Sequence, residues 1–142
     1  MVLRLVLGVV YVGMAVGQLV SWQQMPEILA AYRVMLDAQA LAGVLIAGEL
    51  VCGVWFLARP RSQNLAPVWV YTAVSVVWAA LGTQAYLRGL DVANCGCFGV
   101  YLTQRLSLFV LAQDALLLLY AGLMIRSGLR ARVAPPVKVE AG

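Results

Sequence analysis

Two cysteines separated by one residue, Cys95 and Cys97, are the residues of this sequence best suited to covalent chemistry. A disulfide needs Cα atoms within roughly 4.4–6.8 Å of each other, and residues i and i+2 lie at the far end of that range unless the chain kinks. Gly96 permits the kink because it has no Cβ to clash. A ring this small is expected to be strained, and a strained disulfide is more easily reduced. The spacing therefore favours thiol–disulfide exchange.

The residues around the pair supply tight turns and positive charge. Gly89 and Gly99 let the backbone turn on either side of the cysteines. Arg88 and Arg105 flank the pair, and a neighbouring cation stabilises a thiolate. The start of the last apolar segment adds the positive end of a helix dipole. The residues predicted to support the reactive loop are Arg88, Gly89, Gly96, Phe98, Gly99 and Arg105.

Two other uses of the cysteine pair stay open. A metal site needs more ligands than two sulfur atoms, and the loop adds only Asp91 and Asn94. A static disulfide would close almost no loop and would remove little entropy from the unfolded chain. The chain has no histidine, which argues against haem, histidine-bound zinc and serine–histidine catalysis. The third cysteine, Cys52, lies alone in an apolar segment and is expected to pack as a small apolar residue.

The elements that must position this loop are membrane helices. Hydrophobic residues make up 63% of the 142 residues and charged residues only 11%, and the mean hydropathy is +0.90. So few charges cannot cover the surface of a soluble protein of this size. Four apolar segments are each long enough to cross a hydrocarbon layer of about 30 Å as a helix. They are residues 2–22, 38–58, 66–87 and 106–125. The predicted fold class is an all-α, integral membrane four-helix bundle over residues 1–132.

The two ends of the chain need separate interpretation. The first apolar segment resembles a signal peptide in two respects. Arg4 gives it a positively charged N-terminal region, and the small residues at 15–17 match a cleavage site. Its apolar run continues to Trp22, which favours a retained first helix. Residues 133–142 contain two adjacent prolines and are predicted to form a disordered C-terminal tail.

The distribution of Lys and Arg predicts the orientation of the bundle. With four spans, both termini and the second loop share one side of the membrane. That side carries seven basic residues, and the opposite side carries three. The positive-inside rule then places both termini in the cytoplasm and the cysteine loop on the extracytoplasmic face. We expect a multi-pass protein of the bacterial cytoplasmic membrane, with its net charge of +4 explained by basic flanks rather than by nucleic-acid binding.

Polar side chains inside the apolar segments form a second candidate site. Charged residues are costly in a membrane and are usually functional there. One interpretation is a polar track in the outer half of the bundle, below the cysteine loop, that serves as a proton path or as a site for a quinone headgroup. The other interpretation is hydrogen bonding between helices. The residues concerned are Gln18, Glu49, Gln84, Gln113 and Asp114.

Small residues at helical spacing indicate close packing. Gly13 and Gly17 have GxxxG spacing, and Gly48 and Cys52 repeat the pattern in the second apolar segment. Such spacing allows two helices to approach closely. It leaves a homo-oligomer open.

Together these residues give the sequence a resemblance to the MauE family, within the wider DoxX-like group of four-helix membrane proteins. The motif that carries it is Arg88-Gly89, a short spacer, and Cys95-Gly-Cys-Phe-Gly99. Further similarity, over about residues 5–125, lies in the glycines of the first span and in Pro26, Tyr32, Glu49 and Gly53. The resemblance implies that Cys95 and Cys97 are a redox pair, that the partner is a thioredoxin-like extracytoplasmic protein, and that the role is methylamine utilisation or a related maturation pathway.

The leading hypothesis is a membrane thiol–disulfide oxidoreductase, or the membrane half of one. One cysteine would attack a disulfide of the partner, and the other would resolve the mixed disulfide. The electrons would pass to or from another carrier, for which a quinone is the simplest candidate. A second hypothesis is a scaffold that anchors a thioredoxin-like partner without exchanging thiols. A third is the binding or transport of a soft metal ion.

Overall fold

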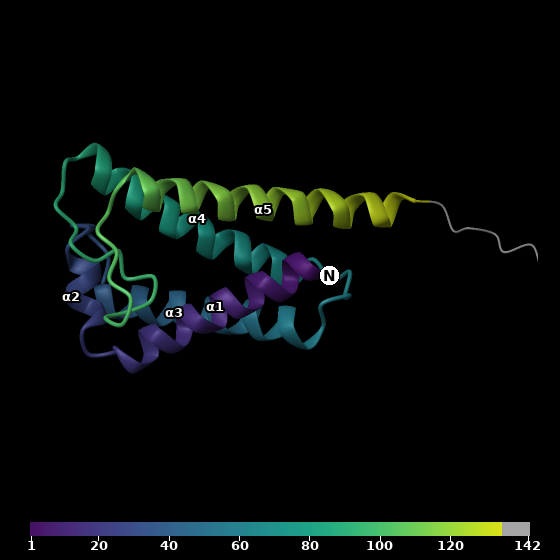
Figure 1. The fold of residues 1–142 in the computed structure, drawn as a ribbon, viewed down its shortest axis with the longest axis horizontal. Coiled ribbons are helices and arrows are strands. Elements are labelled where there is room, and N and C mark those ends of the chain that lie inside the picture. Colours follow the sequence, from purple (N-terminus) through teal and green to yellow (C-terminus); the bar gives the residue numbers. More distant parts are fainter. Residues whose placement is uncertain (135–142) are drawn as a thin grey trace, which may run out of the picture.

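The computed structural model describes residues 1–134 and shows long helices capped at one end by a short helix and a loop (Figure 1). The helices are α1 (Val2–Val20), α2 (Met25–Ala30), α3 (Ala38–Ala58), α4 (Ala66–Leu87) and α5 (Leu108–Val133). Four of them, all except α2, are long and apolar enough to cross a membrane. The predicted all-α, four-span fold is therefore confirmed, and the described residues contain no strand.

The four long helices alternate in direction. The N-terminus and the far end of α5 lie at one end of the bundle, while α2 and the loop of residues 88–107 lie at the other (Figure 1). Local sequence sets where the helices begin. The Asp37 carboxylate accepts a hydrogen bond of 2.7 Å from the Ala40 amide and caps α3. Pro67 lies in the first turn of α4, where its missing N–H costs no hydrogen bond.

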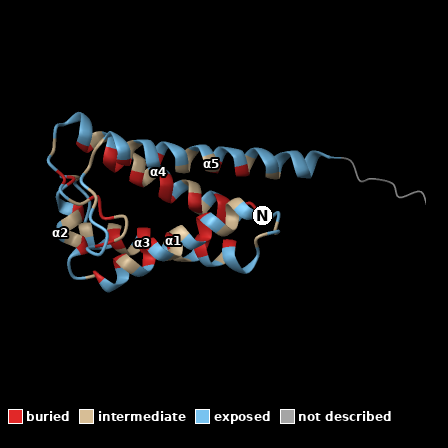
Figure 2. Ribbon diagram, in the orientation of Figure 1, coloured by how far each residue is buried: buried red, intermediate tan, exposed pale blue. Residues whose placement is uncertain are grey.

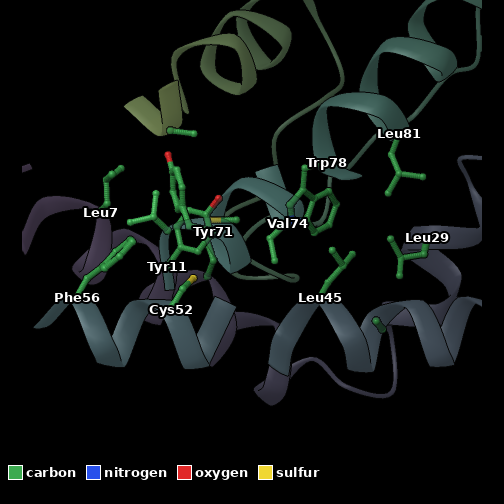
Figure 3. Close-up of a cluster of buried hydrophobic side chains, with 14 of the residues drawn as sticks. Leu7, Tyr11, Leu29, Leu45, Cys52, Phe56, Tyr71, Val74, Trp78 and Leu81 are labelled. Carbon is green, nitrogen blue, oxygen red and sulfur yellow. The ribbon is translucent and has the colours of Figure 1, made fainter. Parts of the chain in front are cut away.

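The bundle is built by successive packing of α1 on α3, α3 on α4 and α4 on α5. Buried residues lie along these contacts, and the outward faces carry exposed apolar side chains, as lipid requires (Figure 2). The core between the helices contains a cluster of aromatic side chains (Figure 3). The rings of Tyr11 and Tyr71 lie 4.8 Å apart, and the hydroxyls of Tyr11 and Ser75 are 2.6 Å apart. Cys52 is fully buried in this core, as expected.

Small residues permit two different kinds of close approach. A Cβ on Gly48 would lie 2.7 Å from Cγ2 of Val74 on α4, so this position serves helix contact, as predicted. A Cβ on Gly17 would instead lie 2.6 Å from the carbonyl oxygen of Phe98 in the loop. A Cβ on Gly13 would lie 3.9 Å from the Phe98 ring, an ordinary contact distance. The prediction that the GxxxG spacing of α1 serves helix packing was therefore wrong, because both glycines lie against Phe98 of the loop and Gly17 makes room for its backbone.

The boundaries differ from the sequence-based expectations at three places. α1 ends at Val20, and the short helix α2 follows in a segment expected to be a loop. α5 begins at Leu108 and continues to Val133, eight residues beyond the expected end at residue 125. Of the tail predicted to be disordered from residue 133, residues 135–142 lie outside the described part of the chain.

The loop is anchored to α1 at Gly99. Its φ is +64°, and a Cβ would overlap the carbonyl oxygen of Gly17 and the hydroxyl of Ser21. We expect Gly99→Ala to lower the free energy of unfolding by more than the roughly 1–2 kcal/mol that a left-handed backbone costs alone, because the overlap adds to the strain. Thermal unfolding in detergent measures the loss.

Gly89→Ala is the matched control for this prediction. Gly89 has a similar φ of +66°, but no neighbouring atom lies within 4 Å of a Cβ built there. Equal losses of stability in the two variants would show that Gly99 does not anchor the loop.

Candidate functional site

The two cysteines lie together in the turn of the loop. Their sulfur atoms are 3.4 Å apart, and both thiols are free. Gly96 between them has a φ of +84°, which is the kink expected from the sequence. A disulfide bond has a length of about 2.05 Å, so the two sulfurs would have to move roughly 1.4 Å closer to form it. The pair is held as a dithiol close to bonding geometry.

Hydrogen bonds within the loop fix its conformation. The Asn94 side chain accepts from the Gly96 amide at 3.0 Å and donates to the Gly99 carbonyl at 2.9 Å. The Cys95 amide donates to the Gln104 carbonyl at 2.7 Å. This bond joins the first and second halves of the loop. Asn94 therefore shapes the turn, although the sequence suggested it only as a weak metal ligand.

Side chains of the bundle hold the loop from below. The Tyr32 hydroxyl donates to the Cys95 carbonyl at 2.8 Å. The Gln18 amide donates to the Cys97 carbonyl at 2.8 Å and to Glu49 Oε2 at 3.0 Å. Each cysteine thus has its backbone carbonyl fixed by a buried side chain. Burial raises the pKa of Tyr32, so its hydroxyl remains a donor.

Glu49 is the centre of this support and is fully buried. Its Oε2 accepts from Gln18, and its Oε1 accepts from the indole of Trp78 at 2.7 Å. Both carboxylate oxygens are therefore paired with neutral donors on α1 and α4. The role of Trp78 was missed, because a tryptophan in the middle of an apolar span gives no sign of its partner.

The predicted polar track is divided into separate groups. Gln84 donates to the Tyr32 carbonyl at 2.9 Å and accepts from Arg88 at 3.0 Å, so it stabilises the segment after α2. Gln113 and Asp114 lie on α5 and line a cavity. Only Gln18 and Glu49 are joined by a hydrogen bond. Which of these polar side chains meet depends on how each helix is rotated about its own axis. The spacing of the residues in the sequence does not predict that rotation.

The two arginines expected to stabilise a thiolate are engaged elsewhere. Arg105 forms an exposed ion pair with Asp91 at 2.7 Å. Arg88 donates to Gln84 and, at 3.2 Å, to the carbonyl of Arg33. In both cases the guanidinium is paired with oxygen atoms. The expectation that these arginines lower the pKa of a cysteine is corrected.

The cysteines instead perturb each other. Their mutual hydrogen bond lowers the pKa of Cys95 to about 7, although burial and the Asp114 carboxylate oppose that change. The same hydrogen bond, together with burial, raises the pKa of Cys97 well above its ordinary value. One proton is therefore held preferentially on Cys97, and Cys95 is the stronger candidate for the nucleophilic thiolate.

The accessibility of the two cysteines differs. Cys95 is 1% exposed, whereas Cys97 is half-buried and lines a cavity of about 300 Å³ beside α1 and α5. Asp114 lies in the same wall, is 6% exposed and has no hydrogen-bond partner among the described residues. The described part of the chain has no group of three or more His, Cys, Asp or Glu residues placed to hold a metal ion.

Removing the hydrogen bond between the thiols should change the titration of Cys95. In a Cys52→Ala background, we expect Cys97→Ala to raise the pKa of Cys95 from about 7 toward or above the usual value of about 8.5. Ultraviolet absorbance of the thiolate as a function of pH measures it. Cys95→Ala is the control, since Cys97 alone should form no thiolate near neutral pH. Unchanged titration of Cys95 in Cys97→Ala would contradict the proposed cause.

Comparison with known proteins gives one finding. The family model described as methylamine utilisation protein MauE matches residues 1–127, which include every helix except the last turns of α5. No curated protein and no solved structure matches the chain.

Proposed function

The chain belongs to the MauE family, and we propose that it is a membrane thiol–disulfide exchange protein whose reactive pair is Cys95 and Cys97. Family membership and the four apolar helices point to a multi-pass membrane protein, and the family suggests a role in methylamine utilisation. The observation that carries the proposal is the dithiol itself. Its sulfurs are 3.4 Å apart, and their pKa values are displaced in opposite directions.

The unequal pKa values assign different roles to the two cysteines. The Cys95 thiolate attacks one sulfur of a partner disulfide, that S–S bond breaks, and the other partner sulfur leaves as a thiolate. Cys97, deprotonated, then attacks the Cys95 sulfur and releases the partner fully reduced. The product is the Cys95–Cys97 disulfide. The same steps in reverse oxidise a partner dithiol.

A thioredoxin-like extracytoplasmic protein suits this chemistry as the partner. Such proteins exchange disulfides through a mixed disulfide with one exposed cysteine. Because Cys95 is 1% exposed, the loop must open before a protein can reach it. The loop is held on the bundle by hydrogen bonds that include those from Tyr32 and Gln18, and by apolar packing of the buried Val92 side chain. Each hydrogen bond contributes about 0.5–1.5 kcal/mol and burial of a valine side chain roughly 1.5–3 kcal/mol, so partner binding must supply the energy of opening.

The burial of Cys95 also favours a second candidate function, a scaffold that binds the thioredoxin-like partner without exchanging thiols. In that case the close cysteine pair is a local clasp for the loop. Trapping experiments separate the two functions, since only exchange requires a covalent bond to the partner.

Cys97→Ser should trap the exchange intermediate. The probe is a thioredoxin-fold protein with one cysteine, activated as a mixed disulfide with a good leaving thiol. We expect Cys97→Ser to form a covalent adduct with it that a reducing agent cleaves, because Cys95 attacks and no thiol resolves the product. Cys95→Ser should form far less, and the double variant none. No adduct above that of the double variant would support the scaffold and contradict exchange.

We also propose that the protein lies in the bacterial cytoplasmic membrane with the cysteine loop on the extracytoplasmic side. The support is the excess of Lys and Arg at the end of the bundle that holds the N-terminus. Two exposed loop positions at opposite ends test it, Thr103 and Gln63. In a chain without native cysteines, an impermeant maleimide added to intact cells should label Thr103→Cys and not Gln63→Cys. Labelling of Gln63→Cys alone would reverse the orientation.

A further inference from the structure

A cavity lies where the bundle is open. α1 packs on α3 and α5 packs on α4, and the described structure shows no comparable packing of α1 against α5. The cavity occupies this side and has a volume of about 300 Å³. Its outer lining includes Val6 and Leu116, which are 53% and 45% exposed on the faces turned to lipid. The cavity is therefore reached from the membrane.

The volume and lining limit what can enter. Sites for small molecules range from roughly 300 to 1,000 Å³, so this cavity accommodates one ring system and no bulky lipid. Most of the lining is apolar, and Trp78, Phe98 and Tyr120 add aromatic side chains. The polar groups gather toward the cysteine loop: Cys97, Gln104, Gln113 and Asp114. The occupant must be an apolar, membrane-dissolved molecule with a polar or reactive ring.

Asp114 gives independent evidence that the cavity receives a ligand. It is 6% exposed, lines the cavity and has no hydrogen-bond partner among the described residues. A buried carboxyl group without a partner is costly, and in membrane spans such residues are usually functional. Glu49 is not available to a ligand in the same way. Both of its carboxylate oxygens accept hydrogen bonds, and it does not line the cavity.

We propose that this cavity binds the ring of a membrane-dissolved quinone, which oxidises the Cys95–Cys97 dithiol through Cys97. The inference rests on the proposed function, since it supplies the electron acceptor for the same pair. Oxidation of a dithiol releases two electrons and two protons, and a quinone takes up both. Among carriers soluble in lipid, the quinone class meets this demand with the single ring that the cavity admits.

The step balances without another reactant. The Cys97 thiol loses its proton to Asp114, and its sulfur adds to a ring carbon of the quinone. The Cys95 thiolate then attacks the Cys97 sulfur, so the S–S bond forms and the S–C bond breaks. The electron pair of that bond passes to the ring, which takes up two protons: the Cys97 proton held by Asp114, and one from water that replaces the proton Cys95 released when it became a thiolate. One dithiol and one quinone thus give one disulfide and one hydroquinone.

Reduction of a quinone by the purified protein tests the inference. The full chain is reduced, freed of reductant and placed in lipid nanodiscs, and decyl-benzoquinone is added as the probe. We expect one quinone reduced per cysteine pair, with the Cys95–Cys97 disulfide as the protein product. Leu116→Trp should slow the reaction by at least about tenfold, because even small displacement of reacting groups is costly.

Three further variants test whether the reaction takes place in the cavity. Leu119→Trp introduces the same side chain on α5 at a position that is 57% exposed and outside the cavity lining, so it should leave the rate unchanged. Asp114→Asn should slow quinone reduction, and Asp114→Glu should retain most of it. Leu116→Trp and Leu119→Trp should both leave adduct formation with the thioredoxin-fold probe unchanged when each is combined with Cys97→Ser.

The outcomes distinguish this inference from the proposed function. If the protein forms the adduct but reduces no quinone, the cavity has another role and thiol exchange stands. If Leu119→Trp slows the reaction as much as Leu116→Trp, the quinone does not react from this cavity. If neither adduct nor quinone reduction is seen, both proposals fail together.

Discussion

Gln18 connects the reactive loop to the bundle through one amide nitrogen, which donates both to the Cys97 carbonyl and to Glu49. Irregular backbone at membrane depth is tolerated only where protein satisfies its polar groups. Without Gln18 the Cys97 carbonyl would lose this partner, and an unpaired buried acceptor costs about 1–3 kcal/mol. The position of the cysteine pair therefore depends on a glutamine in α1, far from it in sequence.

Other unusual features of the bundle follow from that arrangement. Gln18 can donate in two directions only because Glu49 is a fixed acceptor, and Glu49 stays buried because Trp78 pairs with its second oxygen. The loop can come within reach of Gln18 because Gly17 leaves room for the backbone of Phe98. Ser21 completes the junction by accepting from the Val100 amide at 3.0 Å. One face of α1 thus binds the loop, while its other contacts pack on α3.

The sequence predicted the features that depend on run length and local spacing. Apolar runs of about 20 residues gave all four spans, and the Cys-Gly-Cys spacing identified the pair with the kink at Gly96. It did not predict which polar residues meet, because a single sequence does not fix the rotation of a helix about its axis. Helix α2 was missed because six residues are too few for a recognisable period. The partners of Arg88 and Arg105 depended on oxygen atoms placed by the fold.

The two cysteines face different surroundings, and the two proposed reactions take place on different sides of the pair. In the closed loop Cys97 faces the membrane cavity, while Cys95 is covered and its carbonyl is bound by Tyr32. A soluble protein thiol cannot reach Cys95 in this state, but a small molecule from the lipid can reach Cys97. The opening that the proposed exchange requires would break the hydrogen bonds from Tyr32 and Gln18 and expose Cys95, and it would move Cys97 away from the cavity wall. In the proposed scheme, oxidation by a lipid-soluble acceptor and exchange with a protein partner therefore belong to different positions of one loop. In the proposed scheme these positions exclude each other, so the electrons of a partner dithiol would reach the acceptor only through the reduced Cys95–Cys97 pair.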